Sequence, residues 1–328
     1  MTITETVEMR GFGSRDLDRV VDLFDVVWPT AEGHRERTHW AFGANPVGTV
    51  PLVGAFDTET GAMVGVRGGI RWPLAGGVPG DALTAIQLHG TCVHPEYRRM
   101  RLFTRMCEEF VRQARDSGFD VIFNVSVAAS RAGYERLGWR YLPGFRAYHR
   151  IERLGSVVRR LARRGSPGAQ AGSRVPESSR PAFGEVREFI DRRDSLLGEL
   201  AHTAYPEDFF GWRFSHSTHR IAGSADVGYC AYRVRTVGGL RDVLFGDLWP
   251  APRRAAALIA AVVDAERADT STIWMSGTHP LRGTLLRHGF IPDLRRSLHF
   301  GVKTLSGRAE ALVAPSRWGC VSADIDTF

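Results

Sequence analysis

The stretch HGTCVHPEYRRMRLF, residues 89–103, joins an apolar strand to an amphipathic helix through a short turn at residues 94–98. A strand that ends where a helix begins leaves several backbone N–H groups unpaired at the positive end of the helix dipole. Phosphate and pyrophosphate groups bind at such a helix start. The junction therefore predicts an anion-binding loop in front of the helix, and we use it to interpret the rest of the chain.

The length and composition indicate a two-domain globular protein. The chain has 328 residues, of which 43% are apolar and 24% are charged, so each half can bury a core of ordinary size. The first twenty residues are charged, and the longest apolar stretch, residues 255–263, is too short to cross a bilayer. We therefore expect a soluble cytoplasmic protein with no membrane partner.

The formal net charge of +7 suits an anionic partner such as CoA phosphates, an acidic carrier protein or RNA. A solvated basic surface would explain the charge equally well. The cysteines have no C-x-x-C spacing, so the sequence predicts neither a zinc site nor a disulfide framework. We expect no metal, and we expect reduced, structural cysteines at Cys92, Cys107, Cys230 and Cys320.

The order of predicted elements repeats on either side of residues 153–183, a basic Gly/Ser/Pro-rich segment that we interpret as a linker. The repeat divides the chain into domains at residues 1–152 and 184–328, and the alternation of strands and helices predicts an α/β fold in each. The first copy has predicted strands at 7–12, 52–57, 63–72, 83–93 and 120–125 and helices at 16–28, 102–117 and 130–137. The second has predicted strands at 228–235, 241–248 and 272–276 and helices at 185–197 and 255–268.

The two copies differ at the phosphate-loop position. Residues 247–255 of the second copy read DLWPAPRRA, with no glycine and two prolines. Proline at a helix start removes amide donors that a pyrophosphate would need. If only one copy is catalytic, we expect it to be the first.

The junction at residues 89–103 resembles the acyl-CoA pyrophosphate loop of the GNAT superfamily of N-acetyltransferases, whose pattern is Gln/Arg-x-x-Gly-x-Gly/Ala. Arg98 stands at the first position of that pattern, and Arg101 and Phe103 stand where glycines are usual. The resemblance covers residues 7–150 well and residues 184–303 weakly. It implies two fused GNAT-like domains, each a mixed, splayed β-sheet flanked by helices, with a degenerate second copy.

In that family the acyl thioester lies between two parallel strands that splay apart, and a deprotonated amine attacks it directly. The resemblance implies an N-acyltransferase that moves an acyl group, in the first instance acetyl, from acyl-CoA to a primary amine of a small molecule. The Thr91 amide would polarise the thioester carbonyl, and Val93 would pair with pantetheine. The implied acyl-CoA contacts are Thr91, Val93, Arg98, Arg99, Met100, Arg101, Leu102, Phe103 and Ser130.

Tyr134 is the main candidate for catalysis. It lies in residues 124–139, which are similar to the family's strand-to-helix segment ending in Tyr-x-x-x-Gly-Phe/Trp. The resemblance implies that its hydroxyl binds the CoA sulfur and protonates it as it leaves. The structural alternative is a tyrosine packed between helix and sheet, with its hydroxyl paired to stabilise the fold. The asparagine that commonly precedes this helix is replaced by residues 127–129, VAA.

The general base is less clear from the sequence. Gln87 stands eleven residues before Arg98, where some family members have a glutamate base, and its amide cannot accept a proton. His89 lies on the same face of the strand by the two-residue period, and an ordinary histidine pKa of ~6.5 suits proton removal. The alternative for His89 is a structural hydrogen bond near a β-bulge. The candidate catalytic residues are thus Tyr134, His89 and Gln87.

Two other functions stay open at this point. One is acyl or aminoacyl transfer from an acyl carrier protein or a tRNA, because a phosphopantetheine arm carries one phosphate and needs no glycine at Arg101. Acidic carrier residues would then meet Arg98, Arg99 and Arg101. The other is a non-catalytic GNAT-fold binding module. Apart from the tRNA alternative, we do not expect a nucleic-acid partner.

Overall fold

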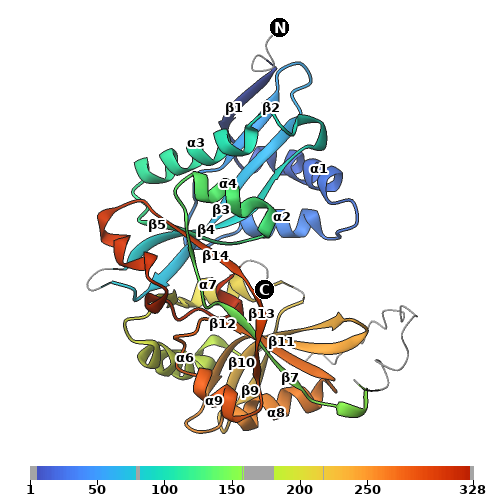
Figure 1. The fold of residues 1–328 in the computed structure, drawn as a ribbon, viewed down its shortest axis with the longest axis vertical. Coiled ribbons are helices and arrows are strands. Elements are labelled where there is room, and N and C mark those ends of the chain that lie inside the picture. Colours follow the sequence, from blue (N-terminus) through green and yellow to red (C-terminus); the bar gives the residue numbers. More distant parts are fainter. Residues whose placement is uncertain (1–5, 79–81, 157, 159–180, 217, 326–328) are drawn as a thin grey trace. The chain divides into compact units, whose positions relative to one another are not determined.

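The structure, a computed structural model, describes residues 6–78, 82–156, 158, 181–216 and 218–325 (Figure 1). The chain divides into two compact units, each assembled from separate stretches of sequence. The first consists of Met1–Leu142 and His299–Val313, and the second of Pro143–Leu298 and Ala314–Phe328. Most of the predicted linker at residues 153–183 lies outside the described residues.

The first unit is a twisted mixed sheet with helices on both faces. Its strand order is β1-β2-β3-β4-β5-β14-β6, and only the β4–β5 pair is parallel. The strands are β1 (Val7–Gly11), β2 (Val53–Asp57), β3 (Met63–Ala75), β4 (Leu83–Val93), β5 (Val121–Ser126), β6 (Arg140–Leu142) and β14 (His299–Thr304). The helices are α1 (Leu17–Val27), α2 (His34–Gly43), α3 (Leu102–Asp116) and α4 (Ala128–Arg136), with short 3-10 turns at Ser14–Asp16, Pro95–Tyr97 and Gly307–Val313.

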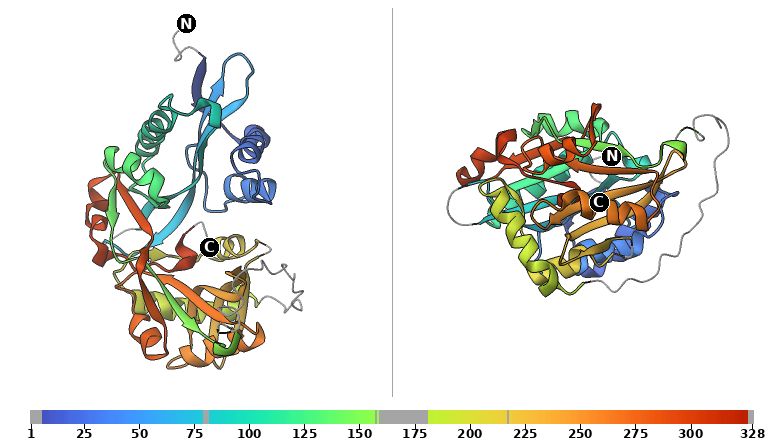
Figure 2. Two further views of the ribbon diagram at one scale, coloured as in Figure 1. Left: turned by 45° about the vertical axis from the view of Figure 1, so that its right-hand side comes forward. Right: turned by 90° about the horizontal axis from the view of Figure 1, so that it is seen from below.

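An apolar cluster lies on each face of this sheet, and a pair of helices covers each cluster. Helices α3 and α4 cover one face, and α1 and α2 cover the other (Figure 2, left). Met106 and Phe110 of α3 pack with Ile86 and Leu88 of β4 on the first face. Phe24 of α1 packs on the second face in a cluster that contains Cys92. Because α3 is strongly amphipathic, its apolar side is buried and its charged side faces solvent.

Strands β4 and β5 pair over a short distance and then separate. The pairing runs from Ala85 with Val121 to Gln87 with Phe123. Strand β4 continues to Val93 without β5 as a partner, so one backbone edge is left open. The predicted splay between two parallel strands is therefore present in the first unit.

The second unit repeats this architecture. Its strand order is β13-β7-β12-β11-β10-β9, and β11–β12 is the parallel pair. The strands of this sheet are β7 (Arg146–Ile151), β9 (Arg220–Ser224), β10 (Gly228–Val237), β11 (Leu240–Pro250), β12 (Thr270–Met275) and β13 (Ile291–Ser297), and the two-residue strand β8 (His202–Thr203) is not part of it. The helices are α6 (Phe183–Leu197), α7 (Glu207–Arg213), α8 (Ala255–Ala265) and α9 (Arg282–Arg287), with 3-10 turns at Pro315–Arg317 and Ser322–Asp324.

The last strand of each repeat lies in the sheet of the other repeat. In the first sheet β14 is inserted between β5 and β6, and in the second β7 is inserted between β12 and β13. The fold class agrees with the sequence prediction of two mixed sheets flanked by helices. The exchange of β7 and β14 was not predicted, because alternating side chains identify a strand without identifying its neighbour.

The described residues lack two further kinds of feature. No helix in the described part of the chain is both long and apolar enough to span a bilayer. Among the same residues, no cluster of three or more His, Cys, Asp or Glu side chains is placed to hold a metal ion. The four cysteines are buried and are not joined in disulfides.

Candidate acyl-donor site in the N-terminal domain

The open edge of β4 is formed by a β-bulge and by the divergence of β5. Arg67 of β3 faces two residues of β4, Gly90 and Thr91, so the ladder is interrupted there. Gly90 has a φ of 62°, which glycine adopts without the strain that a side chain would add. Beyond the bulge, the His94 amide donates to the β3 carbonyl of Val64 at 2.8 Å. Because amides alternate along an antiparallel strand, the Val93 N–H points to the open edge.

Tyr134 lies on α4 with its side chain buried between helix and sheet. The residue is 3% exposed, and its ring contacts those of Phe103 and Trp139 with centroid distances of 5.2 and 5.0 Å. Its hydroxyl accepts a hydrogen bond of 2.6 Å from Nη1 of Arg67. Burial raises the pKa of Tyr134, and the Arg67 charge opposes that rise. The phenol is therefore protonated at neutral pH and can donate a proton.

Arg67 connects Tyr134 to the bulge. The same Nη1 that bonds the Tyr134 hydroxyl also donates to Oγ1 of Thr91 at 2.9 Å. Sequence analysis missed Arg67, although it carries a visible signal. It is a single charge between Val66 and Gly68 in a strand that is otherwise apolar from Met63 to Ile70 and buried along that length.

The structure places His89 and Gln87 on the face of the sheet opposite Tyr134. The His89 ring is buried beside Phe42 and Trp40 of α2, with centroid distances of 5.5 and 6.4 Å. Leu88 packs in the α3-side cluster, so alternation directs Gln87 and His89 toward α2. The candidate acid and the candidate bases are thus separated by the thickness of the sheet at the strand where β4 and β5 diverge.

The predicted phosphate loop retains a left-handed backbone conformation without glycine. Arg99 has a φ of 69° and Arg101, the N-cap of α3, has a φ of 58°. An L-residue in this region costs ~1–2 kcal/mol, so two arginines store strain at the start of the helix. The side chains of Arg98, Arg99 and Arg101 are exposed, while Met100 is half-buried.

The start of α3 is suited to an anion. Its N-cap residue Arg101 makes no side-chain capping bond, and the first turn, which includes Leu102 and Phe103, contains no acidic residue. The first amides of such a helix have no intrahelical partner. Phe103 fits at this position because Gly133 of α4 faces its ring, and a Cβ at Gly133 would lie 3.0 Å from the ring.

The turn before the loop is held by a hydrogen bond to the neighbouring hairpin. The Tyr97 hydroxyl donates to Oδ2 of Asp57 at 2.8 Å. The pKa of Asp57 is lowered to about 2 by the Thr60 backbone amide, followed by the Tyr97 and Thr60 hydroxyls. This anchor gives residues 94–98 a positional role. Ser130, one turn before Tyr134 on α4, donates through its hydroxyl to the Val127 carbonyl at 3.1 Å.

The corresponding part of the second repeat has a bulge and a splay, but its side chains differ. Gly246 is the extra residue of β11, and β11 and β12 stop pairing after Phe245 with Ile273. The fully buried Asp247 follows the bulge, and Arg193 Nη2 of α6 lies 2.9 Å from its Oδ2. The Tyr205 hydroxyl donates to the same carboxylate at 3.3 Å. Burial raises the pKa of Asp247 to about 6, and Arg193 opposes the rise.

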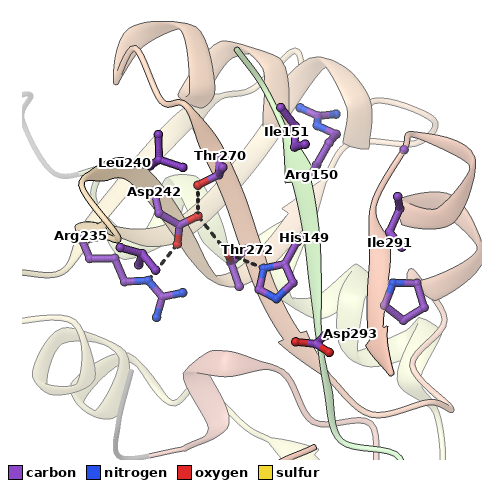
Figure 3. Close-up of a pocket in the computed structure, with 13 residues that line it drawn as sticks. His149, Arg150, Ile151, Arg235, Leu240, Asp242, Thr270, Thr272, Ile291 and Asp293 are labelled. Carbon is purple, nitrogen blue, oxygen red and sulfur yellow. Dashed lines mark hydrogen bonds and ion pairs between the residues drawn. The ribbon is translucent and has the colours of Figure 1, made fainter. Parts of the chain in front are cut away.

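A separate cavity of about 760 Å³ lies on the second sheet and contains none of the predicted site residues (Figure 3). At its base, Thr272 and Thr270 donate to Oδ1 of Asp242 at 3.0 and 2.8 Å. Arg235 donates to the other carboxylate oxygen at 2.8 Å, and His149 Nδ1 lies 3.0 Å from the Thr272 hydroxyl. The carboxylate is thus already paired within the protein.

Comparison with known proteins identifies the fold. A GCN5-related N-acetyltransferase from Kribbella flavida matches with a TM-score of 0.60 at 15% identity, over 92% of this chain and 73% of that chain. A probable N-acyltransferase from Enterococcus faecalis matches with a TM-score of 0.63 at 12% identity, over 93% and 74%. A GCN5-related N-acetyltransferase from Anabaena variabilis gives 0.61 at 11% identity, over 92% and 73%.

At these identities the structural likeness shows the fold alone. No curated protein sequence matches the chain significantly. A family model described as an acetyltransferase (GNAT) domain matches residues 8–142, which contain the splayed strands, the loop before α3 and Tyr134. Residues 8–142 therefore match a GNAT acetyltransferase domain, and the chain as a whole shares its fold with GCN5-related N-acetyltransferases.

Proposed function

We propose that the N-terminal domain is an N-acyltransferase that moves an acyl group, in the first instance acetyl, from acyl-CoA to a primary amine of a small molecule. The observation that carries the proposal is the group formed by Tyr134, Arg67 and Thr91 beside the open edge of β4. Tyr134 would supply the proton for the departing thiolate, and the open backbone edge would hold the pantetheine arm beside it.

The donor would bind along β4 and at the start of α3. Unpaired amides from Leu102 onward would hold the pyrophosphate, with additional charge from Arg98, Arg99 and Arg101. The Val93 backbone would pair with the pantetheine arm, and the thioester carbonyl would accept a hydrogen bond from the Thr91 amide. No glycine is needed for these amides to donate, because the loop already has the required left-handed residues.

Acyl transfer would proceed by direct attack. The amine nitrogen attacks the thioester carbon, and the carbonyl oxygen carries the developing negative charge. When the C–S bond breaks, its electron pair goes to sulfur, which takes the proton of the Tyr134 hydroxyl. The proton lost by the amine would go to His89, directly or through water held near Gln87 on the opposite face of the sheet.

A binding experiment tests the donor. Thermal shift or calorimetry with CoA, desulfo-CoA and an acyl carrier protein, measured in parallel, should give a response to both CoA compounds. No response to CoA at millimolar concentration would contradict the acyl-CoA proposal. A response confined to the carrier protein would support a carrier-bound donor instead.

Substitution of Tyr134 tests the proton donor. We expect Tyr134→Phe to lower the turnover number about 10²-fold to 10⁴-fold, because that is the usual contribution of general acid catalysis. The assay is thiol release from acetyl-CoA with a panel of amino sugars, amino acids and polyamines. Tyr141→Phe is the matched control, since the Tyr141 hydroxyl pairs with Ser126 at 2.7 Å. Equal activity of the Tyr134→Phe and wild-type proteins would remove Tyr134 from the mechanism.

A further inference from the structure

We infer that Arg67 is a positioning residue that makes the buried Tyr134 acidic enough to protonate the departing thiolate. The inference rests on the proposed function. Its geometric basis is one guanidinium nitrogen, Nη1, that donates to the Tyr134 hydroxyl at 2.6 Å and to Thr91 Oγ1 at 2.9 Å. The proton donor is thereby tied to the bulge beside which the thioester would lie.

Arg67 differs from the other buried arginines in how its charge is compensated. Arg193 is paired with Asp247 and Asp194, and Arg213 donates to the backbone carbonyls of Ala323 and Ile325. Among the described residues, no carboxylate forms an ion pair with Arg67, although its side chain is completely buried. Its Nε and Nη2 have no hydrogen-bond partner there.

Aromatic rings provide a weaker form of compensation for the Arg67 charge. The guanidinium carbon lies 5.2 Å from the centroids of both Phe110 and Tyr134. A buried charge without a counter-ion is costly and is seldom kept unless a negative charge forms beside it during function. The buried Arg67 charge is therefore placed to stabilise an anion that forms beside it during the reaction.

The anion arises during thiol release. Burial alone would make Tyr134 a weak acid, because the tyrosinate would be poorly solvated. When the C–S bond breaks and sulfur takes the phenol proton, the negative charge moves to the tyrosinate oxygen, next to Nη1 of Arg67. A fixed positive charge at that distance in a site of low dielectric constant stabilises the tyrosinate. The tyrosinate then recovers a proton from water once the thiol has left.

Thr91 gives Arg67 a fixed orientation. Its hydroxyl accepts from the same Nη1 as Tyr134, so the guanidinium is held at the position where β4 carries its extra residue. Displacement of the bulge would displace the arginine as well. The proton donor and the proposed carbonyl-polarising amide are thus connected through a single side chain.

The test uses the desulfo-CoA complex and needs no acceptor. Tyrosinate absorbance of the full-length protein is titrated in the ultraviolet with desulfo-CoA bound, and the same titration of the matching Tyr134→Phe protein is subtracted to isolate Tyr134. In Arg67→Met we expect the pKa of Tyr134 to lie about one unit or more above its value in the protein with Arg67, a tenfold loss of tyrosinate at a given pH.

Two further variants separate charge from packing. Arg67→Lys keeps the charge and should give a Tyr134 pKa between those of the wild-type protein and Arg67→Met. Arg71→Met, four residues along the same strand, should behave as the wild-type protein does. Equal Tyr134 pKa values in the wild-type protein and Arg67→Met, with equal affinity for desulfo-CoA, would overturn the inference and leave a packing role.

Arg67→Lys decides the question if Arg67→Met fails to fold, because its ammonium cannot reproduce the guanidinium bond to the Tyr134 hydroxyl. A Tyr134 pKa in Arg67→Lys equal to that of the wild-type protein would then overturn the inference. If the wild-type protein binds neither CoA nor desulfo-CoA, the proposed function fails, and the inference fails with it. The two failures are therefore distinguished by whether desulfo-CoA binds.

Discussion

The two repeats share the backbone geometry of their central strands and differ in the side chains at the bulge. Each has a parallel pair of central strands that splay apart, and each has a bulge on the longer strand of that pair. At the first bulge, Arg67 meets a tyrosine hydroxyl and forms no ion pair with any carboxylate among the described residues. At the second, Asp247 is buried against Arg193 and Tyr205. The first repeat thus holds a buried cation among aromatic rings, and the second holds a buried ion pair.

On the proposed function, this difference implies that the splay alone does not make a donor site. The second repeat has the same strand geometry, but two prolines precede α8, and its N-cap Arg254 has a φ of −104°. In the first repeat, Arg101 holds the left-handed conformation that leaves the first amides of α3 available. The catalytic assignment therefore depends on side chains and on one turn, because the topology is common to both repeats.

The strongest test of the comparison is to break the ion pair of the second repeat. Arg193→Met leaves Asp247 buried without its cation, which should lower the free energy of unfolding by roughly 3–5 kcal/mol. Urea unfolding measures the loss, and CoA affinity should stay at the wild-type value. Arg220→Met is the control, since its pair with Glu266 is partly exposed and should cost only about 1 kcal/mol.

A fall in CoA affinity with little loss of stability would contradict this reading of Arg193. The ion pair would then contribute to donor binding, and the second repeat would no longer serve as the inactive reference for the first.

The second test uses the pH dependence of stability in the second repeat. Burial lowers the pKa of His279 to about 3, and the charges of Arg193 and His202 act in the same direction. The neutral ring accepts a hydrogen bond at Nδ1 from the Leu281 amide. The neutral ring contributes stability that is present above the unfolded pKa of ~6.5 and is lost as pH falls toward 3. Between pH 6.5 and pH 5 the loss should be roughly 2 kcal/mol.

Comparison of the wild-type protein with His279→Gln isolates this contribution. Asp247 acts in the opposite sense, because its raised pKa of about 6 favours the folded state as pH falls below that value. Chemical unfolding at a series of pH values should therefore show a smaller fall in the free energy of unfolding at acid pH in His279→Gln than in the wild-type protein. Parallel curves for the two proteins would mean that His279 is protonated in the folded state.

The smallest expected effect concerns the loop of the first repeat. Arg101→Gly removes the strain of a left-handed L-residue and loses some of that gain to the entropy of the unfolded chain, so stability should rise by up to about 1 kcal/mol. Arg98→Gly is the matched control. Arg98 has a φ of −66°, and glycine there should reduce stability by roughly 0.5–1 kcal/mol.

The effect of Arg101→Gly on ligand affinity distinguishes free CoA from a carrier-bound donor. Closer approach of the backbone to a pyrophosphate should preserve or raise CoA affinity, whereas a carrier protein that uses the Arg101 charge would bind more weakly. A loss of stability in Arg101→Gly would show that the arginine side chain stabilises the loop by a contact that outweighs the strain.

The sequence predicted most of the fold because its patterns are local. The amphipathic period of α3 and the apolar run of β4 each specify an element from nearby residues alone. The junction at residues 94–98 likewise predicted a helix start at Leu102, which the structure has. The repeated order of elements was visible for the same reason.

Features that depend on distant parts of the chain were missed. Arg67 lies 67 residues from Tyr134 in sequence, and nothing local to β3 indicates that a tyrosine of α4 meets it. The separation of His89 from Tyr134 by the sheet follows from the alternation of β4 before its bulge, together with the packing of α4 on the Leu88 side, which nothing local to β4 indicates. The roles of His89, Gln87 and Ser130 stay predictions.

The exchange of β7 and β14 has a consequence for synthesis of the protein. Strand β14, at residues 299–304, fills the gap between β5 and β6, so the sheet of the first unit is incomplete until residue 304 has left the ribosome. A chain cut after residue 152 would expose the unpaired edges of β5 and β6, and exposed edges promote association between chains. Each repeat therefore needs a strand of the other repeat to complete its sheet.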